Sequence, residues 1–115
     1  MNRGEIYNAE LDPPGALPGH EQTGYRPVLV ISPRAYNNRS LFVLIVPLTT
    51  NLNTLTLPYT IRIEPSRTNG LDVPSVLLVL QCRSLDKRRI RTDRYRGVIE
   101  SEVLTRVMSI IEEMV

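Results

Sequence analysis

The sequence contains very few of the residues that build metal sites, disulfides and aromatic cores. Its 115 residues include one cysteine, one histidine, one phenylalanine and no tryptophan. Cys82 alone cannot form an intrachain disulfide, and Cys82 with His20 cannot supply the four ligands of a structural zinc site. The core must therefore be aliphatic, made of valine, leucine and isoleucine, and we expect Cys82 to be a packed strand residue.

Several kinds of segment are missing as well. The N-terminal residues lack the apolar stretch of a secretory signal, and the longest apolar run, Leu41 to Leu48, is too short to cross a bilayer. No glycine-rich loop is followed by Lys-Ser or Lys-Thr, which argues against nucleoside triphosphate chemistry. No cluster of carboxylates resembles a two-metal nuclease site. We therefore expect a soluble cytoplasmic protein that works without a cofactor.

The basic residues are nearly all arginine, and half of them lie in one short segment. Thirteen of the 14 are arginine, whose planar fork of donors matches phosphate groups and guanine edges. Seven of the 14 fall between Arg83 and Arg96, opposed there only by Asp86 and Asp93, which gives this segment a local charge of +5. We call residues 83–96 the basic segment. Its charge predicts a polyanion partner, and the alternative is an ordinary solvated face.

The apolar pattern predicts a mainly β fold that ends in a helix. Strands are expected at residues 6–11, 27–31, 41–46, 59–64 and 75–80, with a short last strand at 96–99. A long loop rich in proline and glycine occupies residues 12–19, residues 35–38 form a turn or one short helical turn, and residues 52–57 form a mobile loop. From Ser101 to Met114 the apolar residues recur at helical spacing. We expect a single α+β domain over residues 1–115, built on a small bent sheet or barrel.

Two residues at strand ends are candidates for chemistry on an RNA phosphate. Cleaving RNA without a metal requires proton transfers at the attacking and leaving oxygens and stabilisation of the charge on phosphorus. A scheme with two histidines is not available within one chain, because His20 is the only histidine. Arg26 precedes Pro27, which favours an extended backbone for Arg26 at the start of a buried strand. Thr49 ends another buried strand. Taken singly, each residue also fits a structural role: a surface ion pair for Arg26 and a strand end for Thr49.

Four blocks of sequence, in this order, resemble the MazF/PemK family of toxin endoribonucleases, also called mRNA interferases. The blocks are Arg3 to Tyr7 with Leu11 to Pro13, Gly19 to Gln22 with Gly24 to Ser32, Val46 to Thr50, and Gln81 to Ile90. The resemblance implies a homodimer of small SH3-like, CcdB/PemK-type β-barrels, each with a C-terminal α-helix. It also implies sequence-specific, metal-independent cleavage of single-stranded RNA to 2′,3′-cyclic phosphate and 5′-hydroxyl ends. The implied partner is a MazE-like antitoxin with a disordered acidic tail.

The resemblance assigns catalytic roles to Arg26 and Thr49. Because arginine does not deprotonate in proteins, Arg26 is better suited to stabilising the phosphorane than to acting as a base. Thr49 is better suited to donating a hydrogen bond to a phosphate oxygen than to acting as an acid. The general base stays open between His20 and Glu21. The positions assigned to RNA contact are His20, Glu21, Gln22, Gln81 and Arg83.

The sequence departs from the family pattern in two places, and two other functions stay possible. The stretch between Asp12 and Gly19 is longer than the common family spacing, and Leu80 stands where members often carry an acidic residue. Recognition of RNA bases could therefore differ here. One alternative is a non-enzymatic toxin of the CcdB type, which poisons DNA gyrase. The other is an inactive barrel that only binds RNA.

Overall fold

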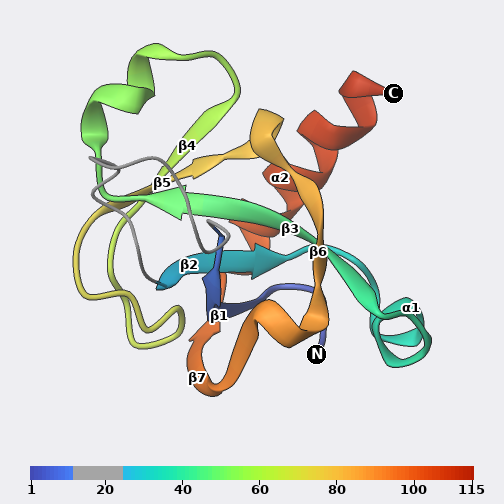
Figure 1. The fold of residues 1–115 in the computed structure, drawn as a ribbon. Helices are drawn as coiled ribbons and strands as arrows, with labels where there is room; N and C mark the ends of the chain where they lie inside the picture. The colour runs from blue at the N-terminus through green and yellow to red at the C-terminus, as the bar shows by residue number, and fades with distance from the viewer. Residues whose placement is uncertain (12–24) are drawn as a thin grey trace, which may run out of the picture.

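The computed structural model describes residues 1–11 and 25–115, which form a bent antiparallel sheet with a helix at the C-terminus (Figure 1). The strands are β1 (Glu5–Glu10), β2 (Tyr25–Val30), β3 (Phe42–Thr49), β4 (Thr60–Ile63), β5 (Ser75–Leu78), β6 (Arg83–Asp86) and β7 (Ile90–Val98). The helices are α1 (Arg34–Arg39) and α2 (Ser101–Met114), and the 3₁₀ turns are η1 (Leu52–Thr56), η2 (Val79–Gln81) and η3 (Lys87–Arg89). The predicted mainly β fold with its closing helix is confirmed.

The long strand β3 changes partner halfway along its length. The sheet runs in the order β4-β5-β3-β2-β1-β7, and β6 also pairs with β3. The first half of β3, up to Ile45, pairs with β6, and its last residues, Leu48 and Thr49, pair with β5. The turn η2 connects β5 to β6 beside this change of partner. Pro47 lies there and has no N–H to donate, so an interruption of the ladder costs less at this position than elsewhere.

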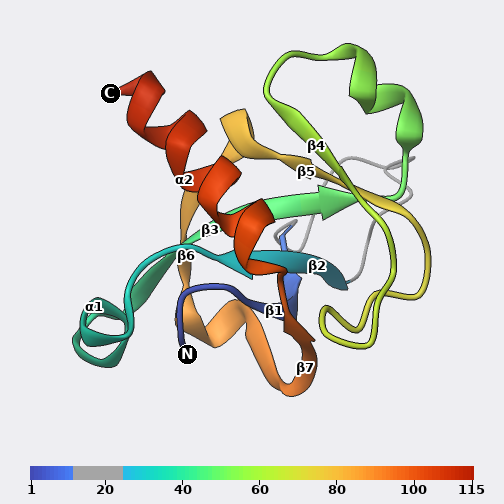
Figure 2. The ribbon, with the colours of Figure 1, turned by 180° about the vertical axis from the view of Figure 1, so that it is seen from behind.

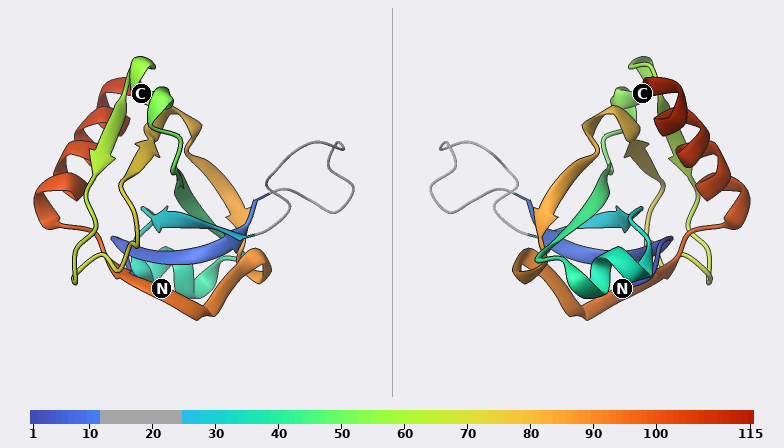
Figure 3. Two further views of the ribbon diagram at one scale, coloured as in Figure 1. Left: turned by 90° about the vertical axis from the view of Figure 1, so that its left-hand side faces the viewer. Right: turned by 90° about the vertical axis from the view of Figure 1, so that its right-hand side faces the viewer.

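Two apolar clusters cover the two faces of the central strands. The inner cluster lies between β1, β2, β3, β6 and the start of β7, and it consists of Tyr7, Ala9, Leu11, Val28, Val30, Val43, Ile45, Leu85 and Ile90. The helix-side cluster lies on the opposite face and includes Leu29, Val46, Leu48, Ile61 and Leu77, with Val107 of α2 packed against them. Figure 2 shows α2 crossing the sheet on this side, and Figure 3 shows the curl of the sheet from its two ends. Because strands β2 and β3 are buried on both faces, they appear in the sequence as continuous apolar runs.

Several predicted boundaries are wrong, chiefly where a strand lies at the surface. The last strand was expected at residues 96–99, whereas β7 spans Ile90–Val98. Most of its residues from Arg91 to Tyr95 are exposed, so this stretch carries no apolar signal. The strand expected from Leu41 is buried only from Val43, because Leu41 is 77% exposed and Phe42 is 45% exposed.

The short turns also differ from expectation. The strand expected at residues 75–80 ends at Leu78, where η2 begins, and β6 is a separate strand that was not predicted. The helical turn expected at residues 35–38 is the six-residue helix α1. The loop expected at residues 52–57 contains η1, whose first turn is held by the side chain of Asn51 accepting from the Asn53 N–H. In the described ranges, no helix is long and apolar enough to cross a membrane.

A buried polar network fastens the loop after β4 to the start of α2. Asn69 is fully buried, and its amide donates to the carbonyl oxygen of Glu64 and to the carboxylate of Glu100 at 2.9 and 3.0 Å. Ser66 Oγ donates to the same carboxylate at 2.6 Å. The loop then lies directly against β7, since a Cβ added at Gly97 would stand 2.3 Å from the carbonyl oxygen of Thr68. The network satisfies polar groups that would otherwise be costly to bury.

We predict that the free energy of unfolding decreases at acid pH because Glu100 becomes protonated and the network loses its carboxylate. Burial opposes ionisation of this carboxyl, but hydrogen bonds from Ser66 and Asn69 outweigh it and lower the pKa of Glu100 below its ordinary value. The unfolded state therefore binds the proton first, and stability is lost as pH falls from about 4.3 through the lower folded-state pKa. In thermal melts from pH 7 to pH 3, the melting temperature of Glu100→Gln should fall less steeply with decreasing pH than that of the wild type. An unchanged slope, with the exposed Glu112→Gln as control, would contradict the assignment.

Candidate active site

Arg26 and Thr49 lie opposite each other at one end of the β2–β3 ladder. The ladder pairs Val28 with Pro47, and continuing its register by two residues places Arg26 across from Thr49. Directly opposed residues on neighbouring antiparallel strands share a face. Both side chains therefore extend the face that carries the inner cluster, and both are half-buried at its end. The extended backbone predicted for Arg26 is confirmed, because the residue belongs to β2.

The hydroxyl of Thr49 is oriented by the backbone that follows it. Its Oγ1 accepts a hydrogen bond from the Asn51 N–H at 3.1 Å. On its other side, Thr49 pairs with Val76 of β5, a fully buried residue. A hydroxyl has one proton to donate besides its two acceptor lone pairs. The bond from Asn51 uses one lone pair, and no hydrogen bond within the described ranges uses the Thr49 proton, which can therefore be donated to a bound group.

Arg26 has no carboxylate partner among the described residues, whereas five of the 13 arginines have one. Over residues 1–11 and 25–115, its side chain takes part in no hydrogen bond or ion pair. Arginines with a carboxylate partner are Arg62, Arg88, Arg91, Arg94 and Arg96. On β1 its neighbour is the fully buried Ala9, whose small side chain leaves room beside the guanidinium. Among the described residues, Arg26 is thus a half-buried cation without a carboxylate partner, at the same end of the sheet as Thr49, which suits the binding of an anion.

Arg83, the first residue of β6, lies at the same end of the inner cluster. It pairs with Ile45 of β3, so its side chain begins on the face shared by Arg26 and Thr49. Its Nη2 donates to the carbonyl oxygen of Leu11 at 2.9 Å and thereby ties the start of β6 to the end of β1. Gln81 is the exposed last residue of η2, two positions before Arg83. The structure thus brings four of the predicted site residues to one end of the sheet from β2, β3, η2 and β6.

The remaining sequence predictions for the site have mixed outcomes. His20, Glu21 and Gln22 lie outside the described residues, as does the lengthened stretch after Asp12. Cys82 is half-buried and packs against the helix-side cluster, but it is the residue that follows η2 and does not lie in a strand. In the described part of the chain, no group of histidine, cysteine, aspartate and glutamate side chains could hold a metal ion.

The basic segment is partly neutralised by its own aspartates. Arg88 donates to Asp86 through its side chain and its backbone N–H, and these hydrogen bonds lower the pKa of Asp86 to about 2. A hydrogen bond from Arg91 likewise lowers the pKa of Asp93. The carboxylates therefore stay charged well into acid solution. The segment keeps its positive excess, and the side chain of Arg88 is 90% exposed.

One feature of the site was missed in the sequence. Tyr25 pairs with Glu10 of β1, so its ring lies on the sheet face opposite to that of Arg26. The guanidinium of Arg91 stands over this ring, 4.8 Å from its centroid. Tyr25 lies inside a block that resembles the family, but nothing in the sequence connected it with Arg91 of β7.

Comparisons with known proteins match nearly the whole chain. A family model described as "PemK-like, MazF-like toxin of type II toxin-antitoxin system" matches residues 2–115. Endoribonuclease MazF of Staphylococcus saprophyticus is 38% identical over 91 residues, which are 79% of this chain and 72% of that protein. The crystal structure of MazF from Deinococcus radiodurans is 28% identical, with a TM-score of 0.74 over 99% of this chain and 94% of the other. A MazE-MazF crystal structure from the same organism (Form-II) is also 28% identical, with a TM-score of 0.76 and the same coverage.

Proposed function

Since the chain belongs to the family of PemK-like, MazF-like toxins of type II toxin–antitoxin systems, we propose that it is a sequence-specific endoribonuclease toxin that cleaves single-stranded RNA. The observation that carries the proposal is the opposed pair of Arg26 and Thr49 at the end of the β2–β3 ladder. The family match and the name of its staphylococcal relative favour this function over the gyrase-poisoning and RNA-binding alternatives.

The proposed reaction is an internal transfer at one phosphodiester. The ribose 2′-oxygen loses its proton and attacks the adjacent phosphorus, and the bond from phosphorus to the 5′-oxygen of the next nucleotide breaks. The leaving 5′-oxygen takes up a proton, so the products are a 2′,3′-cyclic phosphate and a 5′-hydroxyl. Negative charge accumulates on the non-bridging oxygens during the attack, and stabilising it is the main task of the protein.

Arg26 is suited to that stabilisation because its charge is permanent and not cancelled by a neighbour among the described residues. A guanidinium can donate two parallel hydrogen bonds to a phosphate, which fixes the orientation of the group as well as its charge. Arg26 supplies the positive charge and Thr49 supplies a hydrogen-bond donor, so the proposed mechanism requires no metal ion. Arg26 can also donate a hydrogen bond to the leaving oxygen, which takes its proton from solvent or from a side chain other than Arg26.

Thr49 complements Arg26 by donating one directed hydrogen bond to a non-bridging oxygen. Its Oγ1 is held by the Asn51 N–H, so little reorientation is needed when the phosphate arrives. Neither residue is a good base. The base that takes the 2′-proton is His20 or Glu21, and Gln22, Gln81 and Arg83 are proposed to contact the RNA around the cut.

We predict that Arg26→Ala and Thr49→Val each lower the rate of RNA cleavage strongly while the protein stays folded. Removing one donor to a developing oxyanion typically costs about 100- to 1,000-fold in rate. The assay is cleavage of a long single-stranded RNA in the presence of a chelator, followed by mass spectrometry of the ends. Thr49→Ser keeps both hydrogen bonds of the hydroxyl and should retain most of the activity.

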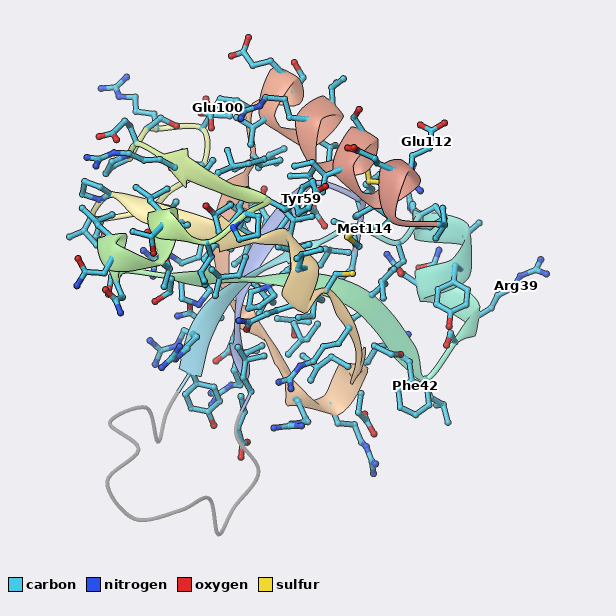
Figure 4. All side chains as sticks on the ribbon, turned by 90° about the horizontal axis from the view of Figure 1, so that it is seen from above. Arg39, Phe42, Tyr59, Glu100, Glu112 and Met114 are labelled. Atoms are coloured by element: carbon cyan, nitrogen blue, oxygen red, sulfur yellow. The ribbon has the colours of Figure 1, made fainter. Side chains whose placement is uncertain are left out.

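Arg39→Ala is the matched control for the loss of a charge. Arg39 ends α1 and projects from the molecule at the end away from the start of β2, as Figures 1 and 4 show. Its removal lowers the net charge equally and should leave cleavage unchanged. Intact RNA with the wild-type protein would refute the proposed activity. Normal cleavage by Arg26→Ala would refute the catalytic assignment alone.

We further propose that the chain acts as a homodimer and is neutralised by a MazE-like antitoxin with an acidic tail. Solved MazE-MazF complexes are similar to this chain in fold, and the basic segment offers an anionic tail an electrostatic landing surface. The tail is expected to cover the proposed RNA-binding site near Arg26. A synthetic acidic tail peptide should therefore inhibit cleavage, and less so at high salt. Binding of the peptide without any loss of cleavage would contradict occlusion, and sedimentation at the monomer mass would contradict the dimer.

A further inference from the structure

We propose that Tyr25, backed by Arg91, is a stacking platform for an RNA base next to the cleaved phosphate. The inference rests on the proposed ribonuclease function and adds a substrate-positioning residue to it. Tyr25 directly precedes Arg26 in β2, and successive side chains of a strand point to opposite faces. A phosphate bound by Arg26 on one face of the sheet therefore has the Tyr25 ring on the opposite face, at the same end of β2.

Tyr25 is one of four half-exposed tyrosines, with Tyr36, Tyr59 and Tyr95, and it is the one that adjoins Arg26 in the chain. Tyr25 is 49% exposed and belongs to neither apolar cluster. Tyr7, by contrast, lies in the inner cluster and packs against the ring of Tyr95, with centroids 5.3 Å apart. A half-exposed aromatic ring beside a phosphate-binding arginine has the composition of a single-strand binding surface, on which bases stack.

Arg91 holds the ring in place from the neighbouring strand β7. Its guanidinium stands over one face of the Tyr25 ring at 4.8 Å, and it is itself oriented by Asp93, with Nε 3.2 Å from Oδ1. A cation against a π face is attracted by the ring quadrupole and restricts the rotation of the ring. The platform is thus fixed before RNA arrives, which reduces the entropy lost on binding.

The charges around the ring favour a base over a phosphate as its ligand. Glu10 pairs with Tyr25 on β1, and Asp93 contacts Arg91, so two carboxylates offset the positive charge of Arg91. A phosphate would be repelled by both carboxylates. A neutral base is not repelled by these carboxylates, and all four bases can stack on an aromatic ring. The platform therefore positions the strand, and recognition of particular bases is left to other residues.

The test uses the fact that the chain contains no tryptophan. In the inactive Thr49→Val background, Tyr25→Trp should bind a short single-stranded RNA about as tightly as Tyr25 does, and the RNA should quench its fluorescence. Tyr25→Leu should bind about tenfold more weakly or worse, with an unchanged melting temperature. Inorganic polyphosphate, which has charge but no bases, should not quench the tryptophan.

Tyr36 supplies the matched controls, because it is 50% exposed on α1, away from the site. Tyr36→Leu should bind RNA normally, and Tyr36→Trp should not be quenched. In the active protein, Tyr25→Leu should raise KM far more than it lowers kcat. Normal RNA binding by Tyr25→Leu, or equal quenching by RNA and polyphosphate, would overturn the platform. Failure of the wild type to cut RNA would instead overturn the proposed function.

Discussion

The antiparallel pairing of β2 with β3 determines how Arg26 and Thr49, the two proposed catalytic residues, lie relative to each other. Val28, Leu29 and Val30 pair with Pro47, Val46 and Ile45, and all six residues are buried. A shift of one residue in this register would move Arg26 to the level of a neighbour of Thr49 and turn the two side chains to opposite faces. Two apolar clusters, one on each face, hold the ladder in place. The chemistry at the strand ends thus depends on packing in the centre of the sheet.

This constraint also explains the division of roles around the site. Residues at the same level of neighbouring strands share a face, so Arg26 and Thr49 are placed to act together on the phosphate in the proposed mechanism. Tyr25 is out of phase by one residue and faces the other side, where Arg91 can reach it from β7. Arg83 donates a hydrogen bond to the carbonyl oxygen of Leu11 and so ties the start of β6 to the end of β1. The proposed phosphate binding and the proposed base stacking are therefore assigned to consecutive residues of one strand.

The sequence predicts the buried half of this fold well and the exposed half poorly. Continuous apolar runs give β2 and most of β3, and helical spacing gives α2, because burial leaves a direct pattern in the residues. The stretch from Arg91 to Tyr95 is a strand only because β1 offers it a partner, and its own residues are polar. The break at η2 has a similar origin, since it depends on which strands pair with β3.

For the site, the sequence proposes the residues but not their arrangement. Arg26, Thr49, Gln81 and Arg83 follow from the ordered family blocks. The opposition of Arg26 and Thr49 could not be predicted, because β2 and β3 are apolar on both faces and alternation cannot choose their register. The contact between Tyr25 and Arg91 depends on strand order, which no local pattern encodes.

A double-mutant cycle on Arg26 and Thr49 tests the central claim that both residues act on one phosphate. Single-turnover cleavage would be measured for the wild type, Arg26→Lys, Thr49→Val and the double variant. Residues that stabilise the same transition-state charge are strongly non-additive, so the double variant should be much faster than the product of the single effects predicts, by a coupling of about 1–3 kcal/mol. Additive effects, with a coupling near zero, would show that the two residues do not share a phosphate.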